Sequence, residues 1–126
     1  MAEGWAKKLH GDSINVFSAG IEKHGLNPQA VRVMQEAGVD ISTQESKTIE
    51  ELSHVSFDVV VTVCSHADQT CPPFVGAPHI IHQAFDDPPK LAFGASTEQE
   101  MLEPYRRVCE EIRRFVVSLP AVLSAL

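Results

Sequence analysis

The stretch that decides the fold is Phe57 to Pro72, FDVVVTVCSHADQTCP. Its apolar run, Val59 to Val63, is interrupted only by Thr62 and is typical of a strand buried on both faces of a parallel sheet. In open α/β sheets the working site lies beyond the carboxyl ends of the strands. Cys64 directly follows this strand, and Cys71 lies in the loop after it. We therefore expect the chemistry of the protein at these two thiols.

The spacing of the cysteines leaves two interpretations open. Cys64 and Cys71 form a Cys-x6-Cys pattern, which is only weakly specific, and both could be small core residues. A bond between them would restrain the loop by about 2–3 kcal/mol in the chain-entropy account. In a reducing compartment such a bond is transient, and transient disulfides are usually catalytic or sensing. Cys109 lies on the apolar face of a predicted helix, so we expect it to be buried and to have no redox role.

Zinc binding is another interpretation of the same region. The candidate ligands are Cys64, His66, Cys71, His79 and His82. Structural zinc sites usually place two to four residues between paired cysteines, and this pair does not fit that spacing. The histidines are therefore expected to pack or to face solvent.

Two adjacent acids precede a pair of prolines in the sequence Asp86-Asp87-Pro88-Pro89. Such a segment is usually a solvated turn. The functional alternative is a general acid held on a rigid loop and aimed at a leaving group. Residue type alone does not decide between the two.

Length, charge and cysteine number limit the class of protein. A chain of 126 residues predicts a single domain over 1–126. The net charge of -7 argues against nucleic acid and anionic membranes as partners. Three cysteines argue against a secreted disulfide framework and for a reducing, cytoplasmic location. We also expect no membrane span and no signal peptide, because no sufficiently long apolar stretch is visible.

Hydrophobic periodicity and turn residues predict the order of elements. Asn27 and Thr97 are the expected helix N-caps. Predicted helices and strands alternate along the chain. This order predicts an α/β fold, a three-layer parallel sheet with helices on both faces. The expected helices are 1–10, 28–37, 48–52 and 97–119, the expected strands are 13–18, 58–64 and 79–82, and a proline-rich loop covers 85–94.

Several motifs together resemble the thioredoxin-coupled arsenate reductases, which share the low-molecular-weight tyrosine phosphatase fold. They span nearly the whole chain and occur in family order. The phosphatase branch shares the SAG and DP features, whereas the cysteine pair after the 58–64 strand points to the reductase branch. The motifs are MAEGWAKKLHGD at 1–12, SAGIEKHGLNP at 18–28, GVDIS at 38–42, VTVCSHADQTCP at 61–72 and FDDP at 85–88.

The resemblance implies an oxidoreductase that acts in arsenic detoxification, binds arsenate or a similar oxyanion, and holds no tightly bound cofactor. In the family, a cysteine in a C-x5-R P-loop attacks arsenate, and an aspartate before proline protonates the leaving oxygen. Two further cysteines then act in turn, and thioredoxin reduces the resulting disulfide. On this chain the second and third cysteines correspond to Cys64 and Cys71, and the acid corresponds to Asp87.

The resemblance also implies a potassium ion near the P-loop in some members. Glu3 and Ser18 correspond to positions of that site, and Lys47 replaces another acidic position. An ammonium group could take the place of the cation here.

One departure from the family concerns the start of the chain. The first strand and the C-x5-R loop are absent from this sequence, and Met1 aligns with a residue inside the family's first helix. No capping residue precedes that helix. We therefore expect an N-terminally truncated, inactive chain with two unpaired sheet edges, beside 13–18 and beside 58–64. The alternatives are a low-molecular-weight tyrosine phosphatase-like protein and a non-catalytic, redox-responsive binding module.

Overall fold

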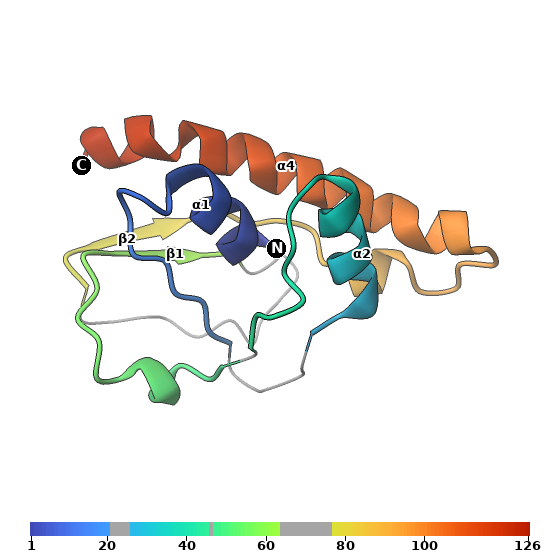
Figure 1. Ribbon diagram of the computed structural model, residues 1–126, viewed down its shortest axis with the longest axis horizontal. Helices are drawn as coiled ribbons and strands as arrows, with labels where there is room; N and C mark the ends of the chain where they lie inside the picture. Colours follow the sequence, from blue (N-terminus) through green and yellow to red (C-terminus); the bar gives the residue numbers. More distant parts are fainter. Residues whose placement is uncertain (21–25, 46, 64–76) are drawn as a thin grey trace.

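The computed structural model describes residues 1–20, 26–45, 47–63 and 77–126 (Figure 1). The described residues form helices and two parallel strands, so the predicted α/β class is confirmed. No helix within the described ranges is long and apolar enough to cross a bilayer. The elements are α1 (Ala2–His10), α2 (Pro28–Glu36), η1 (Glu50–Leu52), β1 (Val59–Thr62), β2 (His79–His82), α3 (Pro88–Leu91) and α4 (Glu98–Ser124).

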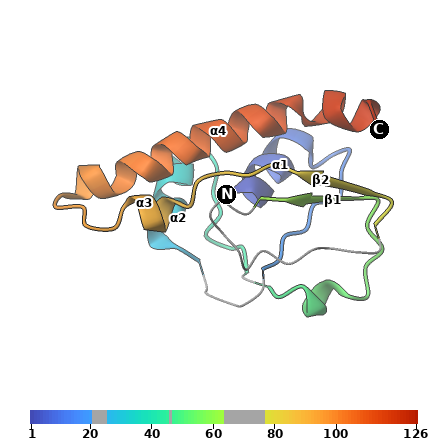
Figure 2. The same cartoon turned by 180° about the vertical axis from the view of Figure 1, so that it is seen from behind.

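The sheet joins β1 and β2 in parallel, with Val59 opposite His79 and Thr62 opposite His82. One further bond continues the pairing, because the Gln83 N–H donates to the Thr62 carbonyl over 2.9 Å. Figure 2 shows the two strands side by side, with the C-terminal part of α4 above them. Since the strands are parallel and in register, their carboxyl ends emerge at the same edge of the sheet.

The predicted burial of β1 on both faces is wrong. Every residue of β1 is half-buried, and Val63, just beyond it, is 42% exposed. A strand inside a parallel sheet needs a neighbour on each side and helices over both faces. β1 has one neighbour, β2, among the described segments.

The strand predicted over 13–18 is also wrong. Instead, the chain turns after α1, where the N–H groups of Ser13 and Ile14 both donate to the His10 carbonyl. The segment makes one isolated parallel bridge, between Gly20 and Thr48, at its far end. A strand is defined by its hydrogen-bonded neighbour, and no described segment supplies one alongside 13–18.

Local signals place most of the helices correctly. Asn27 caps α2, because its side-chain oxygen accepts from the N–H groups of Gln29 (2.9 Å) and Ala30 (3.2 Å). Thr97 caps α4 and accepts from the Glu100 N–H over 3.1 Å. Two short elements differ from prediction: 48–52 contains the 3₁₀ helix η1, and the expected loop 85–94 contains α3. Proline favours the first helical turn, which explains how Pro88 and Pro89 begin α3.

The core lies between α4 and the helices α1 and α2, which pack along it (Figure 1). Gly4 permits this packing: a Cβ atom there would lie 2.5 Å from Ile41 Cγ2 and 3.0 Å from Met34 Cε. The buried residues of α4 recur at helical spacing along one face. They are Leu102, Tyr105, Val108, Cys109, Ile112 and Val116.

A side chain of α1 replaces a backbone hydrogen bond that α4 lacks. Pro120 lies inside α4 and has no N–H, so the Val116 carbonyl four residues earlier loses its helical donor. His10, at the end of α1, places Nε2 2.7 Å from that oxygen. The ring nitrogen therefore takes the place of the missing peptide N–H and joins the two helices.

Candidate functional site

The sequence predicts that the reactive groups of this protein lie at the carboxyl ends of its strands. Cys64 and Cys71 lie outside the described residues, as does the proposed zinc ligand His66. The strand that leads to Cys64 ends beside β2, where Thr62 Oγ1 and His82 Nδ1 share a hydrogen bond of 2.5 Å. The described residues contain no cluster of three or more potential metal ligands.

Asp87 lies on the segment that leaves β2 at this same edge. It precedes α3 as the N-cap residue, and its carbonyl accepts from the N–H groups of Lys90 (3.1 Å) and Leu91 (3.2 Å). Phe85 and Pro88 are buried on either side of it. Both ends of the short acidic segment are thus anchored, and Asp87 itself is half-buried.

The two adjacent acids have different surroundings. The exposed Asp86 accepts from Arg107 Nη2 of α4 over 3.0 Å. The Asp87 carboxylate neither caps α3 nor bonds to any other side chain in the described part of the chain. Of the two acids, Asp87 is therefore the one whose carboxylate has no bond to another described side chain.

Glu3, the first residue predicted for a potassium site, is buried, with 7% of its surface exposed. Its carboxylate lies 3.5 Å from Lys7 Nζ. In the favoured orientation of the Gln44 amide, the nitrogen donates to Glu3 Oε1 and the oxygen accepts from the Gly4 N–H, both over 3.2 Å. The ammonium beside Glu3 is therefore that of Lys7, whereas the sequence had suggested Lys47.

Ser18, the second residue predicted for that site, is exposed on the irregular segment between α1 and α2. No side-chain bond joins it to Glu3 in the described structure. The potassium role of the two residues stays a prediction.

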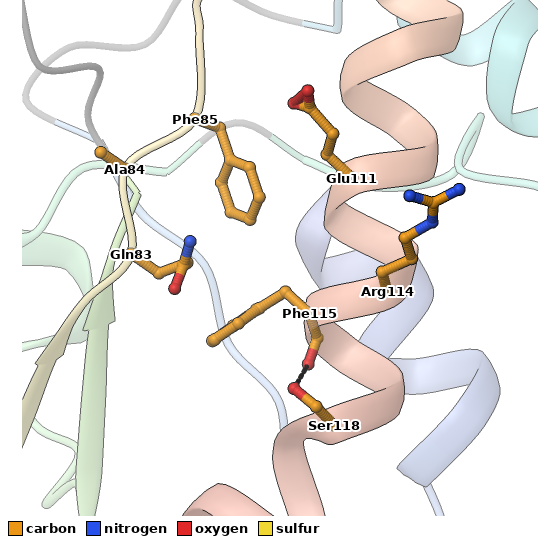
Figure 3. Close-up of a pocket in the computed structure, with 7 residues that line it drawn as sticks. All are labelled: Gln83, Ala84, Phe85, Glu111, Arg114, Phe115 and Ser118. Atoms are coloured by element: carbon orange, nitrogen blue, oxygen red, sulfur yellow. Dashed lines mark hydrogen bonds between the residues drawn. The ribbon is translucent and has the colours of Figure 1, made fainter.

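A hollow that the sequence did not indicate lies between α4 and the segment after β2 (Figure 3). Its volume is about 460 Å³. Phe85 and Phe115 meet in it edge to face, with ring centroids 6.0 Å apart. Such a hollow depends on the approach of two segments far apart in sequence, so periodicity could not reveal it. Its lining comprises Gln83, Ala84, Phe85, Glu111, Arg114, Phe115 and Ser118.

Cys109 has the surroundings expected of a structural thiol. It is 4% exposed, and its Sγ lies 3.5 Å from Met34 Sδ in the core. Burial raises the pKa of the Cys109 thiol. A raised pKa lowers the thiolate fraction and with it the reactivity. The predicted burial of Cys109 is confirmed.

Comparison with known proteins shows the family to which this chain is related. The profile of the low molecular weight phosphotyrosine protein phosphatases matches residues 1–124. The chain belongs to this family.

The relatives of this family member include arsenate reductases. Those of Halalkalibacterium halodurans and Bacillus subtilis are each 47% identical to it, over 112 and 114 residues respectively. Each match covers 89% of this chain and 78% of the relative.

Solved structures of arsenate reductases also resemble it. One in the phosphate binding state matches with a TM-score of 0.76 at 32% identity, covering 95% of this chain and 85% of that one. One in the reduced state matches with a TM-score of 0.74 at 33% identity, covering 97% and 86%. The predicted low-molecular-weight phosphatase fold is confirmed.

Proposed function

We propose that this protein is an arsenate reductase that works through a cysteine relay. The observation that carries the proposal is the 47% identity to proteins with that activity in their names. The solved relative in the phosphate binding state supports an oxyanion as the ligand, because phosphate and arsenate share shape and charge. The reaction takes place in the reducing cytoplasm, which suits a chain with three cysteines.

The proposed reaction balances as a two-electron reduction. Arsenate loses one oxygen as water and becomes arsenite, while two thiols become one disulfide. At the end of the relay, the disulfide joins Cys64 and Cys71. The dithiol of thioredoxin then attacks it and takes over the oxidised state, so that both thiols of this protein are regenerated.

Asp87 is proposed as the acid that protonates the departing oxygen. The parallel register supports this role, because Val63 and Gln83 leave neighbouring strands at one edge. Neighbouring strands lie about 4.8 Å apart. Thr62 and His82, the last residues of these two strands, therefore lie side by side, and the sequence continues from them toward Cys64 and Asp87 respectively.

The 126 residues are proposed to have no arsenate turnover by themselves. None of the three cysteines is followed by arginine at the sixth position, so the C-x5-R pattern is missing. Without it the first nucleophile and the cradle for the oxyanion are both lacking. An assay with thioredoxin, its reductase and NADPH tests this: arsenate-dependent NADPH consumption by this chain contradicts the proposal.

Mild oxidation followed by mass spectrometry tests the relay itself. We expect two of the three thiols to disappear, with a disulfide joining Cys64 to Cys71 and Cys109 still free. Thioredoxin should restore both thiols. The variant Cys71→Ser is the matched control and should lose no pair of thiols within one molecule. A bond that involves Cys109, or no disulfide at all, contradicts the relay.

The name of the family favours a second candidate, a phosphotyrosine phosphatase. That activity needs no disulfide between Cys64 and Cys71. If oxidation leaves all three thiols intact, the phosphatase interpretation is preferred over the reductase. A non-catalytic, redox-responsive binding module would form the disulfide but show neither activity in the complete protein.

A further inference from the structure

The segment that carries Asp87 is fastened to α4 on both sides of this acid. Figure 3 shows the segment after β2 beside α4, where the Phe85 ring meets Phe115. After Asp87, Pro88 is buried and α3 packs against α4. The backbone of the segment is therefore held at both ends, and the ion pair of Asp86 lies between these two contacts.

Arg107 pairs with a carboxylate of this segment although its own helix offers two. Glu103 and Glu111 lie four residues before and after Arg107, which is the spacing at which ion pairs form within a helix. The Arg107 guanidinium is joined to neither of them in the described structure. Instead, its Nη2 donates to Asp86 Oδ2 over 3.0 Å. The bond thus connects α4 to the acid segment in preference to a bond within the helix.

The two adjacent acids compete for this one guanidinium. Consecutive Cα atoms are about 3.8 Å apart, a distance that the long arginine side chain can span by changing rotamer. Asp87 is half-buried, and its carboxylate has no bond to another described side chain. An arginine beside a carboxyl group favours the ionised form, which has no proton to give. A bond from Arg107 to Asp87 would therefore remove the acid that the proposed reaction needs.

We propose that Arg107 is a positioning residue: by holding Asp86, it leaves Asp87 unpaired for the reaction. The inference rests on the role of Asp87 as general acid in the proposed function. The pair of Arg107 and Asp86 is exposed and contributes little to stability. Its effect is therefore on which of the two acids is unpaired, and not on whether the segment folds.

Carbodiimide labelling of the 126-residue chain tests the pairing, because it couples an amine to carboxyl groups that have no partner. Fragmentation mass spectrometry distinguishes Asp86 from Asp87. Exposure alone would make Asp86 react faster, whereas the proposal expects Asp87 to be labelled at least about threefold faster. In Arg107→Gln, Asp86 should become the faster of the two. Arg114→Gln, which removes a partner of Glu110 on the same helix, is the matched control and should change neither rate.

A second variant tests whether Arg107 can reach Asp87. Asp86→Asn removes the partner of Arg107 and leaves Asp87 as the remaining carboxylate of the segment. We expect the labelling of Asp87 to fall at least about threefold, and Asp86→Asn/Arg107→Gln to restore it. If Arg107 pairs with Glu103 or Glu111 instead, the labelling of Asp87 stays at the level of the parent chain, and the proposal is overturned. Faster labelling of Asp86 than of Asp87 in the parent chain also overturns it.

Turnover distinguishes failure of this inference from failure of the proposed function. It is measured in a chain extended upstream by a C-x5-R loop, in which Asp87→Asn should lose arsenate reduction. Retained turnover in that variant contradicts the acid role of Asp87 but not the labelling result. If Asp87 is the acid, Asp86→Asn should lower kcat at least about tenfold at an unchanged KM, and the added Arg107→Gln should restore it. Equal kcat values in Asp86→Asn and in the double variant indicate a purely structural pair and overturn the inference.

Discussion

At the residue scale, the carboxylate of Glu110 shows how strongly neighbouring arginines can lower a pKa. Glu110 on α4 accepts from Arg113 over 2.5 and 2.8 Å and from Arg114 over 3.3 Å. The bond from Arg113 is the main cause that lowers the pKa of Glu110 from 4.5 to about 2, and Arg114 adds to it. The sequence shows the spacing of these residues but not that both arginines turn toward one acid.

We therefore predict that Glu110 stays ionised until the pH approaches 2. Because its pKa is lower in the folded chain, its contribution to stability is present above pH 4.5 and is lost as the pH falls toward 2. The contribution is small, since the pair is exposed to solvent. NMR titration of the carboxyl carbon measures this pKa. In Arg113→Gln it should move back toward 4.5, and an unchanged value contradicts the assignment.

At the element scale, the sequence predicted the two caps and the strands within 58–64 and at 79–82, and failed on the strand at 13–18. Asn27 and Thr97 could be recognised because a cap depends on the next three residues only. The segment 13–18 has the alternation of a strand, yet it forms none, because a strand depends on a partner far away in sequence. The helix α3 was missed for a different reason: two prolines suggested a loop, although proline also suits the first turn of a helix.

Asn27 ties the start of α2 to α4. Besides capping α2, its Nδ2 donates to Tyr105 Oη over 3.0 Å. We predict that Asn27→Ala lowers the free energy of unfolding by about 2 kcal/mol, about half from the cap and half from the tyrosine bond. Asn27→Ser keeps a cap and should lose only the second half. Chemical denaturation measures both variants, and equal losses contradict this division.

The His10 bond to α4 makes a prediction that can be checked by rescue. His10→Ala leaves the Val116 carbonyl without its donor and should cost about 1–2 kcal/mol. Pro120→Ala restores a peptide N–H at the position that can reach the same carbonyl. In the His10→Ala background this second change should recover most of the loss. Independent, additive effects of the two substitutions in denaturation would argue against the shared carbonyl.

At the scale of the whole molecule, packing explains both the successes and the failures of prediction. The buried face of α4 followed from its spacing, because it covers the core along its length. The burial of β1 did not follow from its sequence pattern, because burial depends on how many neighbouring strands and helices pack against a strand. The site is known in part: Asp87 is anchored as a candidate acid, and the relay of Cys64 and Cys71 stays a prediction.

Gly4 controls how closely α1 approaches the rest of the core. We predict that Gly4→Ala costs about 1–3 kcal/mol, because the added methyl group meets Ile41 at 2.5 Å. The cost should be smaller in an Ile41→Ala background, where the obstructing atom is gone. Thermal and chemical unfolding of the four chains measures the coupling. A cost that does not depend on residue 41 contradicts the packing argument.

The imidazole that completes α4 also provides a natural reporter. Each time the first helix separates from the last, His10 must release the carbonyl oxygen, and the nitrogen resonance of its ring should change. Spectra of this one side chain can therefore follow partial opening of the molecule without an attached probe, and can distinguish separation of the chain ends from events at the sheet.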